Sequence, residues 1–272
     1  MRHIAKKLAL AAACLMVTLS PMGSANAGVG DLLVAPTRLI LDGGRGAEVI
    51  LKNIGTETAT YRVSVEVRRM TEDGALEHIE QPTGDLLKAQ NMIMFAPRKV
   101  VLPPNQPQSV RISARPPADL PDGEYRVHML FRAIPEARPI TRGPENGVGF
   151  RLTPIYGVSI PVIVRLGKVE MQAGLSNAIL TQQEGQRGLS IDLNRAGNRS
   201  TYGVIRMLPA GGGKTIAELK GVAVYAELAK RTFFMPLDNA QLALARGPVT
   251  LQYYEVSDTG EKLMAETKTT IQ

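Results

Sequence analysis

Apolar and polar residues alternate over an unusually long stretch in the middle of the chain. A repeat of two residues is typical of a β-strand, whose successive side chains point to opposite faces. Most strands have about 5–6 residues, so residues 150–164 predict one unusually long strand. Its alternating apolar positions are Phe150, Leu152, Pro154, Tyr156, Val158, Ile160, Val162 and Val164.

Shorter apolar runs, separated by turn signals, precede this strand. They include LLVAPTRLIL, AEVILKNIG, YRVSVEVRRM and GEYRVHMLFRAIP, with DGGRG and TEDG among the turns. Residues 91–113 predict two more strands around a Pro-rich bend. Six or seven strands at this spacing predict a β-sandwich of immunoglobulin type over residues 28 to about 165.

The same kind of pattern starts again after residue 166. Strands and turns are predicted in VEMQAGLSNAIL, GLSIDLNRAGNRSTYGVIRML, TIAELKGVAVYAELAKRTFFMPL, GPVTLQYYEVS and EKLMAETKTTIQ. Residues 222–230 could form a short helix, but their β-branched residues favour a strand. We therefore expect an all-β protein with two domains, residues 28–166 and 167–272. The short connection near RLGKV predicts a fixed angle between the domains and a cleft where they meet.

The first 27 residues are typical of a secretory signal peptide. MRHIAKK is basic, LALAAACLMVTLS is apolar, and ANA at 25–27 is a small-residue cleavage site. We expect export to the periplasm and a mature chain that begins at Gly28. Cleavage removes three basic residues and no acid, so the net charge falls from +7 to +4. Cys14, the one cysteine, is removed too, so the mature chain must hold its fold without disulfides.

No motif for a catalytic, metal-binding or nucleotide-binding site is evident. PAGGGKT at 209–215 has Leu208 where a phosphate loop needs its first glycine, and it predicts a hairpin loop instead. His78 and His128, without cysteines, do not make a typical zinc or copper site. We expect a protein that is not an enzyme and has no cofactor or metal.

Charge and hydropathy exclude two further classes of partner. The mild positive charge has no Lys/Arg block that would mark a nucleic-acid surface. No apolar stretch of about 18 residues follows the signal segment, so no membrane insertion is expected. Three acids lie singly in the sequence, and an acid–base pair from different strands stays open. They are Glu66, Glu124 and Asp192.

Arg38, in APTRLILDG, has two interpretations. It can be an arginine whose stem packs and whose head reaches water. It can also be an anchor in the cleft, because a guanidinium group binds a planar carboxylate at two points. The residues alone favour the first interpretation.

Four segments, in order, resemble the periplasmic pilus chaperones of the chaperone-usher pathway. They are APTRLILDGGRGAEVILKNIG, PRKVVLPPNQPQSVRI, LPDGEYRVHMLFRAIP and IYGVSIPVIVR, and NRAGNRSTYG in the second domain is also similar. The similarity is strongest over residues 34–165 and is nearest to the branch that serves archaic, spore-coat-like pili. It implies two immunoglobulin-like sandwiches set at an angle, like a boomerang.

The resemblance also implies a function for the long strand. Such chaperones lend a strand to pilus subunits that lack their last strand, and deliver them to an outer-membrane usher for pilus assembly. Strand addition of this kind uses an exposed sheet edge and alternate side chains. Self-association through the same strand is a further expectation. The donor residues would be Phe150, Leu152, Pro154, Tyr156 and Val158.

The family anchors the client's C-terminal carboxylate with two basic residues in the cleft. The first corresponds to Arg38, which favours the anchoring interpretation of this residue. At the position of the second, a lysine in the family, this chain has Pro161, and Arg98 or Arg165 are the candidates to replace it. Leu130 stands where the family has an asparagine.

Two other functions remain open at this point. The chain could itself be a structural or adhesive pilus subunit, although the alternating strand is internal and lies at a domain junction, which favours the chaperone. It could also be an enzyme or small-ligand protein, which convergent polar residues in a deep pocket would support.

Overall fold

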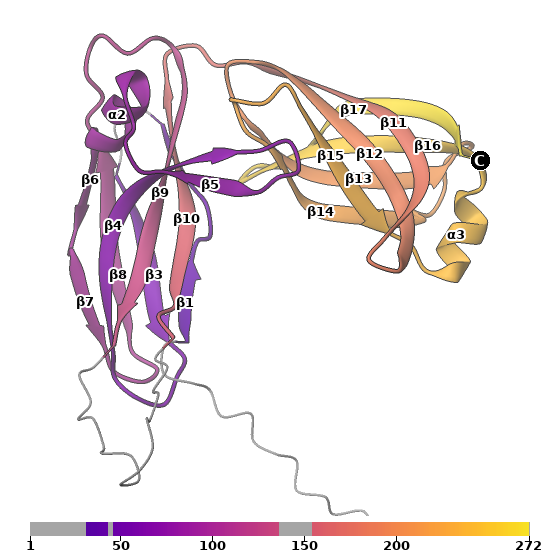
Figure 1. Cartoon of the computed structure of the whole chain (residues 1–272). Helices are drawn as coiled ribbons and strands as arrows, with labels where there is room; N and C mark the ends of the chain where they lie inside the picture. The colour runs from indigo at the N-terminus through magenta and orange to yellow at the C-terminus, as the bar shows by residue number, and fades with distance from the viewer. Residues whose placement is uncertain (1–30, 43–45, 136–153, 272) are drawn as a thin grey trace, which may run out of the picture.

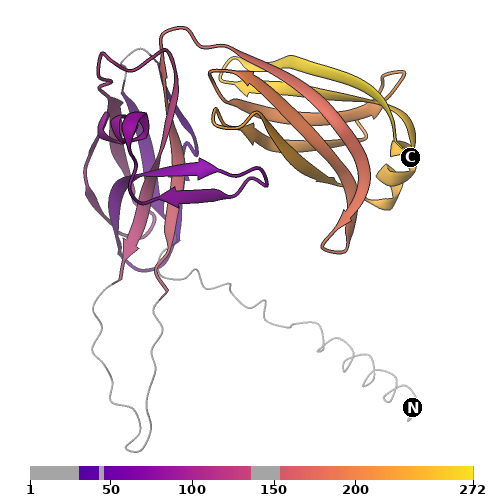
Figure 2. The ribbon, with the colours of Figure 1, turned by 45° about the horizontal axis from the view of Figure 1, so that its top comes forward.

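The chain forms two β-sandwiches whose long axes make an L (Figures 1 and 2). This computed structural model describes residues 31–42, 46–135 and 154–271. The predicted signal segment and two predicted donor residues, Phe150 and Leu152, lie outside the described residues.

The first sandwich consists of a four-stranded and a six-stranded sheet. The four-stranded sheet has the order β1 (Leu32–Ala35), β3 (Ala47–Asn53), β8 (Pro107–Ala114) and β6 (Ile93–Ala96). The six-stranded sheet has the order β2 (Leu39–Asp42), β10 (Gly157–Leu166), β9 (Gly123–Ile134), β4 (Ala59–Met70) and β5 (Leu76–Ile79), with β7 (Lys99–Leu102) paired to β4. One helix, α2 (Gly84–Asn91), connects β5 to β6.

Alternation places the core of this sandwich between the two sheets. In β9 the odd-numbered Val127, Met129 and Phe131 are buried in it, and their even-numbered neighbours lie on the outer face. Ile160, Val162 and Val164 of β10 are buried in the same core. Along this part of β10, the side chains of the even-numbered apolar residues therefore point into the core of the first sandwich.

The second sandwich has a three-stranded and a four-stranded sheet. The first has the order β11 (Met171–Gln183), β12 (Gln186–Gly197) and β15 (Lys230–Pro236). The second has the order β14 (Ala217–Val224), β13 (Thr201–Pro209), β16 (Gly247–Ser257) and β17 (Gly260–Ile271). Helix α3 (Asn239–Ala245) begins at a capping box between Asp238 and Gln241. An all-β fold of two immunoglobulin-like sandwiches, set at an angle, is thus confirmed.

Several local predictions were wrong. The strand expected around Arg38 is two strands, because the chain passes from one sheet to the other at Pro36, which follows a cis peptide bond. Residues 91–113 contribute three strands rather than two. The long strand begins at Gly157, and residues 154–156 are not part of it. Helices α2 and α3 were not predicted, because each forms only about two turns within strand-rich sequence.

Other local predictions hold. The glycine-rich residues 210–215 connect β13 to its antiparallel partner β14, so the hairpin loop is confirmed. Residues 222–224 are the end of β14, and β15 begins at Lys230 after a turn, so no helix forms there.

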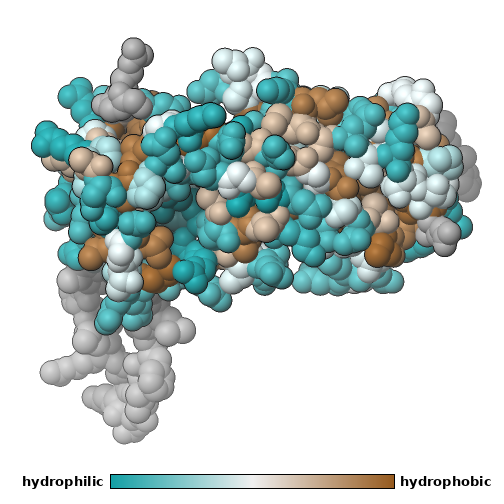
Figure 3. Space-filling view, turned by 90° about the horizontal axis from the view of Figure 1, so that it is seen from above, coloured by the Kyte–Doolittle hydropathy of each residue, from teal (hydrophilic) through white to brown (hydrophobic). Residues whose placement is uncertain are grey.

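Among the described residues no helix is long and apolar enough to cross a membrane. Viewed from above, hydrophobic residues form separate patches among hydrophilic ones (Figure 3).

Candidate functional site

The two edges of β10 are paired to different extents. One edge pairs with β9 along the whole strand, from Gly157 to Leu166. The other edge pairs with β2 only at residues 162–165, where Leu39 lies opposite Val162. No strand in the described part of the chain covers residues 157–161 on that side, and we call this stretch the free edge.

Backbone groups on the free edge point away from the sheet. The Ala133 N–H donates to the Tyr156 carbonyl at 2.8 Å, which places the backbone groups of even-numbered residues toward β9. The groups of Gly157 and Ser159 therefore point outward and are available to a further strand. Pro161 has no N–H to offer, and the pairing with β2 begins just beyond it, where Leu39 lies opposite Val162.

Three of the predicted donor residues lie among the described residues. Tyr156 and Pro154 are exposed, with Tyr156 at 57%. Val158 is partly buried and packs against the core of its own sandwich. The even-numbered side chains thus change from exposed to buried as the chain enters the sheet. Ile155, also exposed, adds apolar surface next to Tyr156.

Arg38 lies where the two sandwiches meet. It follows β1 and precedes β2, and its Nη2 donates to Ser200 Oγ of the second sandwich at 3.3 Å. Its Cζ is 4.9 Å from the ring centroid of Tyr202. Nη1 is buried and has no hydrogen-bond partner among the described residues. Burial lowers the pKa of Arg38, although Tyr225 and Glu124 act in the opposite direction.

The two other candidate cations differ in position. Arg165 lies near enough to Arg38 for its charge to act on it, and its Nε donates to Glu124 Oε2 at 3.2 Å. Arg98 is exposed beside Phe95. It directly precedes β7, which lies at the opposite edge of the same sheet from β2 and β10. The structure therefore brings Arg165 together with Arg38 and leaves Arg98 apart.

A hairpin of the first sandwich reaches the second sandwich (Figure 1). Beyond Glu66, strand β4 leaves its pairing with β9 and pairs with β5 instead. The Met70 N–H donates to Glu227 Oε1 at 2.8 Å. Met70 also packs with Ile163 and Tyr225 in a small buried cluster. The sequence predicted the TEDG turn of this hairpin, but no local signal indicated its partner.

Arg126 strengthens the same contact. Its Nη2 donates to the Arg68 carbonyl at 2.9 Å and also pairs with Glu227. Its Cζ lies 3.5 Å from the ring centroid of Tyr225, a cation–π geometry. No local sequence signal indicated this role of Arg126, because its partners Arg68 and Glu227 are 58 and 101 residues away in the chain.

Asn198, in the NRAGNRSTYG segment, forms the second link between the sandwiches. Its side chain donates to the Lys168 carbonyl at 3.0 Å and accepts from the Glu170 N–H at 2.9 Å. Its own carbonyl accepts from the Glu124 N–H at 3.0 Å. Two links on different elements therefore hold the sandwiches at the angle seen, and Arg38 lies in the same junction.

His128 and the acids Glu66 and Asp192 are buried or ion-paired within the fold. His128 is 1% exposed, and neither ring nitrogen has a hydrogen-bond partner in the part of the chain that the structure describes. Burial, together with the charges of Arg126 and Arg68, lowers its pKa to about 3. No group of three or more potential metal ligands occurs within residues 31–42, 46–135 and 154–271. Glu66 pairs with Arg68, and Asp192 with Lys230.

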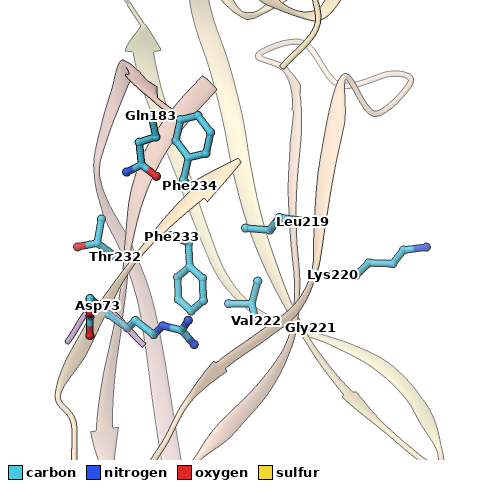
Figure 4. Close-up of a pocket in the computed structure, with 10 residues that line it drawn as sticks. Asp73, Gln183, Leu219, Lys220, Gly221, Val222, Thr232, Phe233 and Phe234 are labelled. Carbon is cyan, nitrogen blue, oxygen red and sulfur yellow. The ribbon is translucent and has the colours of Figure 1, made fainter. Parts of the chain in front are cut away.

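A hollow of about 550 Å³ lies between β14 and β15 of the second sandwich (Figure 4). Its wall includes Val222 and Phe233, and the tip of the β4–β5 hairpin contributes Asp73. Asp73 bonds with Thr71 and Ala75 of its own turn. Lys220 points away from the hollow in Figure 4. Arg231, a further lining residue, donates to the Ala223 carbonyl at 3.1 Å. Since these charged groups are bonded to the protein or point away, the hollow does not support the small-ligand hypothesis.

Comparison with known proteins gives structural matches alone. No protein-family model and no curated protein sequence matches the chain. The chain is similar to the Escherichia coli chaperone DraB, with 14% identity, 91% of this chain and 99% of that chain covered, and a TM-score of 0.48. It is also similar to a chain of the CsuC–CsuE chaperone–tip adhesion subunit complex from archaic Csu pili of Acinetobacter baumannii, with 15% identity, 89% and 99% covered, and a TM-score of 0.47.

A third similar structure is a chain from the complex of Salmonella enterica SafA pilin with the SafB chaperone. It has 18% identity, covers 90% of this chain and 98% of that chain, and has a TM-score of 0.47. These similar structures are pilus chaperones of the chaperone-usher pathway, the class that the sequence segments resemble. Identities and TM-scores this low assign no function, which has to come from the geometry of the site.

Proposed function

We propose that the chain is an assembly chaperone that binds incomplete pilus subunits by lending them β10 and the residues before it. The observation that carries this proposal is the free edge at residues 157–161, directly beside the exposed Tyr156. An unpaired edge next to exposed apolar side chains is what strand addition requires.

Binding would combine backbone and side-chain contacts. The outward groups of Gly157 and Ser159 would pair with a strand of the subunit, while Tyr156 and the residues before it fill its open groove. Each apolar side chain that becomes fully buried contributes about 1.5–3 kcal/mol before ordering costs. Phe150, Leu152, Pro154 and Val158 complete the proposed donor set.

Arg38 is the proposed anchor for the C-terminal carboxylate of the subunit. The contacts with Ser200 and Tyr202 fix its guanidinium group, and Nη1 is left without a partner. Because Nη1 is buried in the free protein, a carboxylate would reach it once the guanidinium group turns toward the cleft, and would then form a charge-assisted hydrogen bond. Arg165 is the candidate second cation, although Glu124 already neutralises it.

The remaining parts of the proposal concern the cellular setting. Residues 1–27 would direct export to the periplasm, followed by domains at 28–166 and 167–272. The loaded chaperone would deliver its subunit to an outer-membrane usher. In the free protein, the open edge would favour self-association. The proposal needs no catalysis and no cofactor.

Periplasmic capture tests the function. The tagged chain would be purified from the periplasm of its pilus-expressing host and analysed by size exclusion and mass spectrometry. We expect a roughly one-to-one complex with a small β-sandwich subunit. Tyr156→Glu should reduce the captured subunit by about tenfold or more, because it places a charge in an apolar groove. Leu244→Glu, a change at an equally exposed apolar residue of α3, is the matched control.

Each outcome has a clear meaning. Equal capture by Tyr156→Glu and the wild type would contradict strand donation from this segment. Recovery of polymers of the chain itself would favour a structural pilus subunit. A monomer without partner, under conditions in which pili are made, would overturn the proposed function.

A further inference from the structure

Three cations form a row across the outer face of the six-stranded sheet, and the row runs from strand to strand toward the free edge. Lys99 of β7 lies opposite Arg62 of β4, which lies opposite Arg132 of β9. Arg132 in turn lies opposite Gly157, the first residue of β10. The buried neighbours of these residues face the core, so all three cations lie on the outer face, where they are exposed. We call them the cation row.

Within the part of the chain that the structure describes, no acid neutralises the cation row. No ion pair among residues 31–42, 46–135 and 154–271 involves Lys99, Arg62 or Arg132. The next row toward the second sandwich contains the uncharged Ser64, Leu130 and Ser159. The first acid on this face is Glu66, one row further, and it is paired with Arg68 at 2.6 Å. Like charges directly opposite each other destabilise a sheet.

Protection of sheet edges against aggregation accounts for Lys99, which lies on the edge strand β7, but not for Arg62 and Arg132. Charges that prevent edge-to-edge pairing lie on the edge strand itself. Here the edge strand β10 contributes Gly157, Ser159 and Pro161 to the outer face, none of them charged. Arg62 and Arg132 lie on interior strands. The positive charge therefore lies on the face of the sheet next to any strand that is added to the free edge.

We propose that the cation row recognises an acidic side chain of the pilus subunit, on the subunit strand that pairs with β10 and at the position opposite Gly157. Paired residues in a sheet have their side chains on the same face, so this acid would extend the row. Gly157 places no side chain between that acid and Arg132, and the nearest side-chain atom is Leu130 Cδ1, 3.2 Å from the position that a Cβ of residue 157 would take. The inference rests on the proposed function and adds a determinant of subunit choice to it.

The first experiment measures association rates with a defined probe. The probe is the subunit that co-purifies with the wild-type chain, released in denaturant and diluted onto immobilised variants. At low salt, Arg132→Glu should slow association by about tenfold, because charges at the rim of an interface act mainly on the association rate. Arg62→Glu should have a smaller effect and Lys99→Glu the smallest. At about 1 M salt, where the Debye length is about 3 Å, the differences should nearly vanish.

Arg246→Glu, an equal change of charge at an exposed residue of the second sandwich, is the control. Circular dichroism would verify that each variant is folded. Unchanged rates for Arg132→Glu, or an equal reduction by Arg246→Glu, would overturn the inference while leaving the proposed function intact. If no subunit co-purifies with the wild-type chain, the proposed function fails, and the inference fails with it.

A second experiment locates the acid. Arg132→Lys keeps the charge and provides an amine, which a carbodiimide joins directly to a neighbouring carboxylate. Mass spectrometry of the cross-linked complex should connect position 132 to one Asp or Glu of the subunit. Replacing that acid with lysine should restore fast association with Arg132→Glu. A complex that forms but gives no cross-link from position 132 would contradict the inference.

Discussion

The two halves of β10 are paired and covered differently, although they belong to one continuous strand. Residues 162–165 pair with β9 on one edge and with β2 on the other. On the outer face of this half, Ile163 is buried under Met70 and Tyr225. Residues 157–161 pair with β9 alone, and Tyr156 just before them is exposed.

This difference arises from the path of one short segment. After β1 the chain crosses to the other sheet at residues 36–38, and it joins β10 only from Leu39 onward. After this crossing, β2 pairs with residues 162–165 of β10 and leaves the same edge open at residues 157–161. The covered half supports the fold and the domain junction, whereas the open half is available for a partner. Substitutions in the two halves should therefore affect different measurements.

The largest effect on stability is expected at Ile163, in the covered half. Ile163→Ala should lower the free energy of unfolding by about 2–5 kcal/mol, because it leaves a cavity between the sheet and Tyr225. Ile155→Ala, just outside the open half, should change it by less than about 0.5 kcal/mol. Urea unfolding of both variants checks the comparison, and similar values for the two would contradict it.

A second effect is expected from pH at the boundary between the halves. His128 lies opposite Pro161 and Glu66 and is buried without hydrogen bonds. Its pKa is lowered from 6.5 to about 3 in the folded protein, so the unfolded chain binds a proton more readily. The stability due to neutral His128 is complete above about pH 7 and is lost progressively as the pH falls from 6.5 toward 3. At about pH 5 the loss is about 2 kcal/mol.

The measurement is the difference in unfolding free energy between about pH 7 and pH 5. Carboxylates also titrate in this range, so the wild type is compared with His128→Leu. We expect this variant to lose about 2 kcal/mol less on acidification. His78→Leu, at a half-exposed side chain of β5, is the control. An equal acid sensitivity in the wild type and His128→Leu would exclude His128 as its source.

Local alternation was sufficient to predict most strands of both sandwiches. In β10 it identified the apolar positions Ile160, Val162 and Val164, and the structure shows that these face the core. It overestimated the length of the strand. An apolar alternation of Pro154 and Tyr156 predicts side-chain phase, but it does not supply the hydrogen-bonded neighbours that define a strand.

Contacts between distant segments could not be predicted in the same way. The TEDG turn indicated a hairpin, but its contact with Glu227 joins residues 157 positions apart. Arg98 and Arg165 were equivalent candidates in the sequence. Only the sheet order shows that Arg98 is far from Arg38 and that Arg165 lies beside it. The cation row, too, depends on the registers of three strand pairs.

The smallest effect on stability, with a clear effect on binding, is expected at Arg38. Its hydrogen bond with Ser200 is 3.3 Å long and Nη1 has no partner, so the fold gains little from its polar head. Arg38→Ala should change the free energy of unfolding by about 0.5 kcal/mol or less. Subunit capture should nevertheless weaken by about tenfold, since a charge-assisted bond to the carboxylate is lost.

A matched comparison separates these two effects. Arg111→Ala removes an arginine whose side chain is 81% exposed on the other sheet of the same sandwich, and it should leave subunit capture unchanged. A subunit shortened by its last residue moves its terminal carboxylate away from the junction. It should bind the wild type as weakly as the full subunit binds Arg38→Ala. If Arg38→Ala weakens binding of the full and shortened subunits by the same factor, Arg38 acts through packing of the junction and not through the carboxylate.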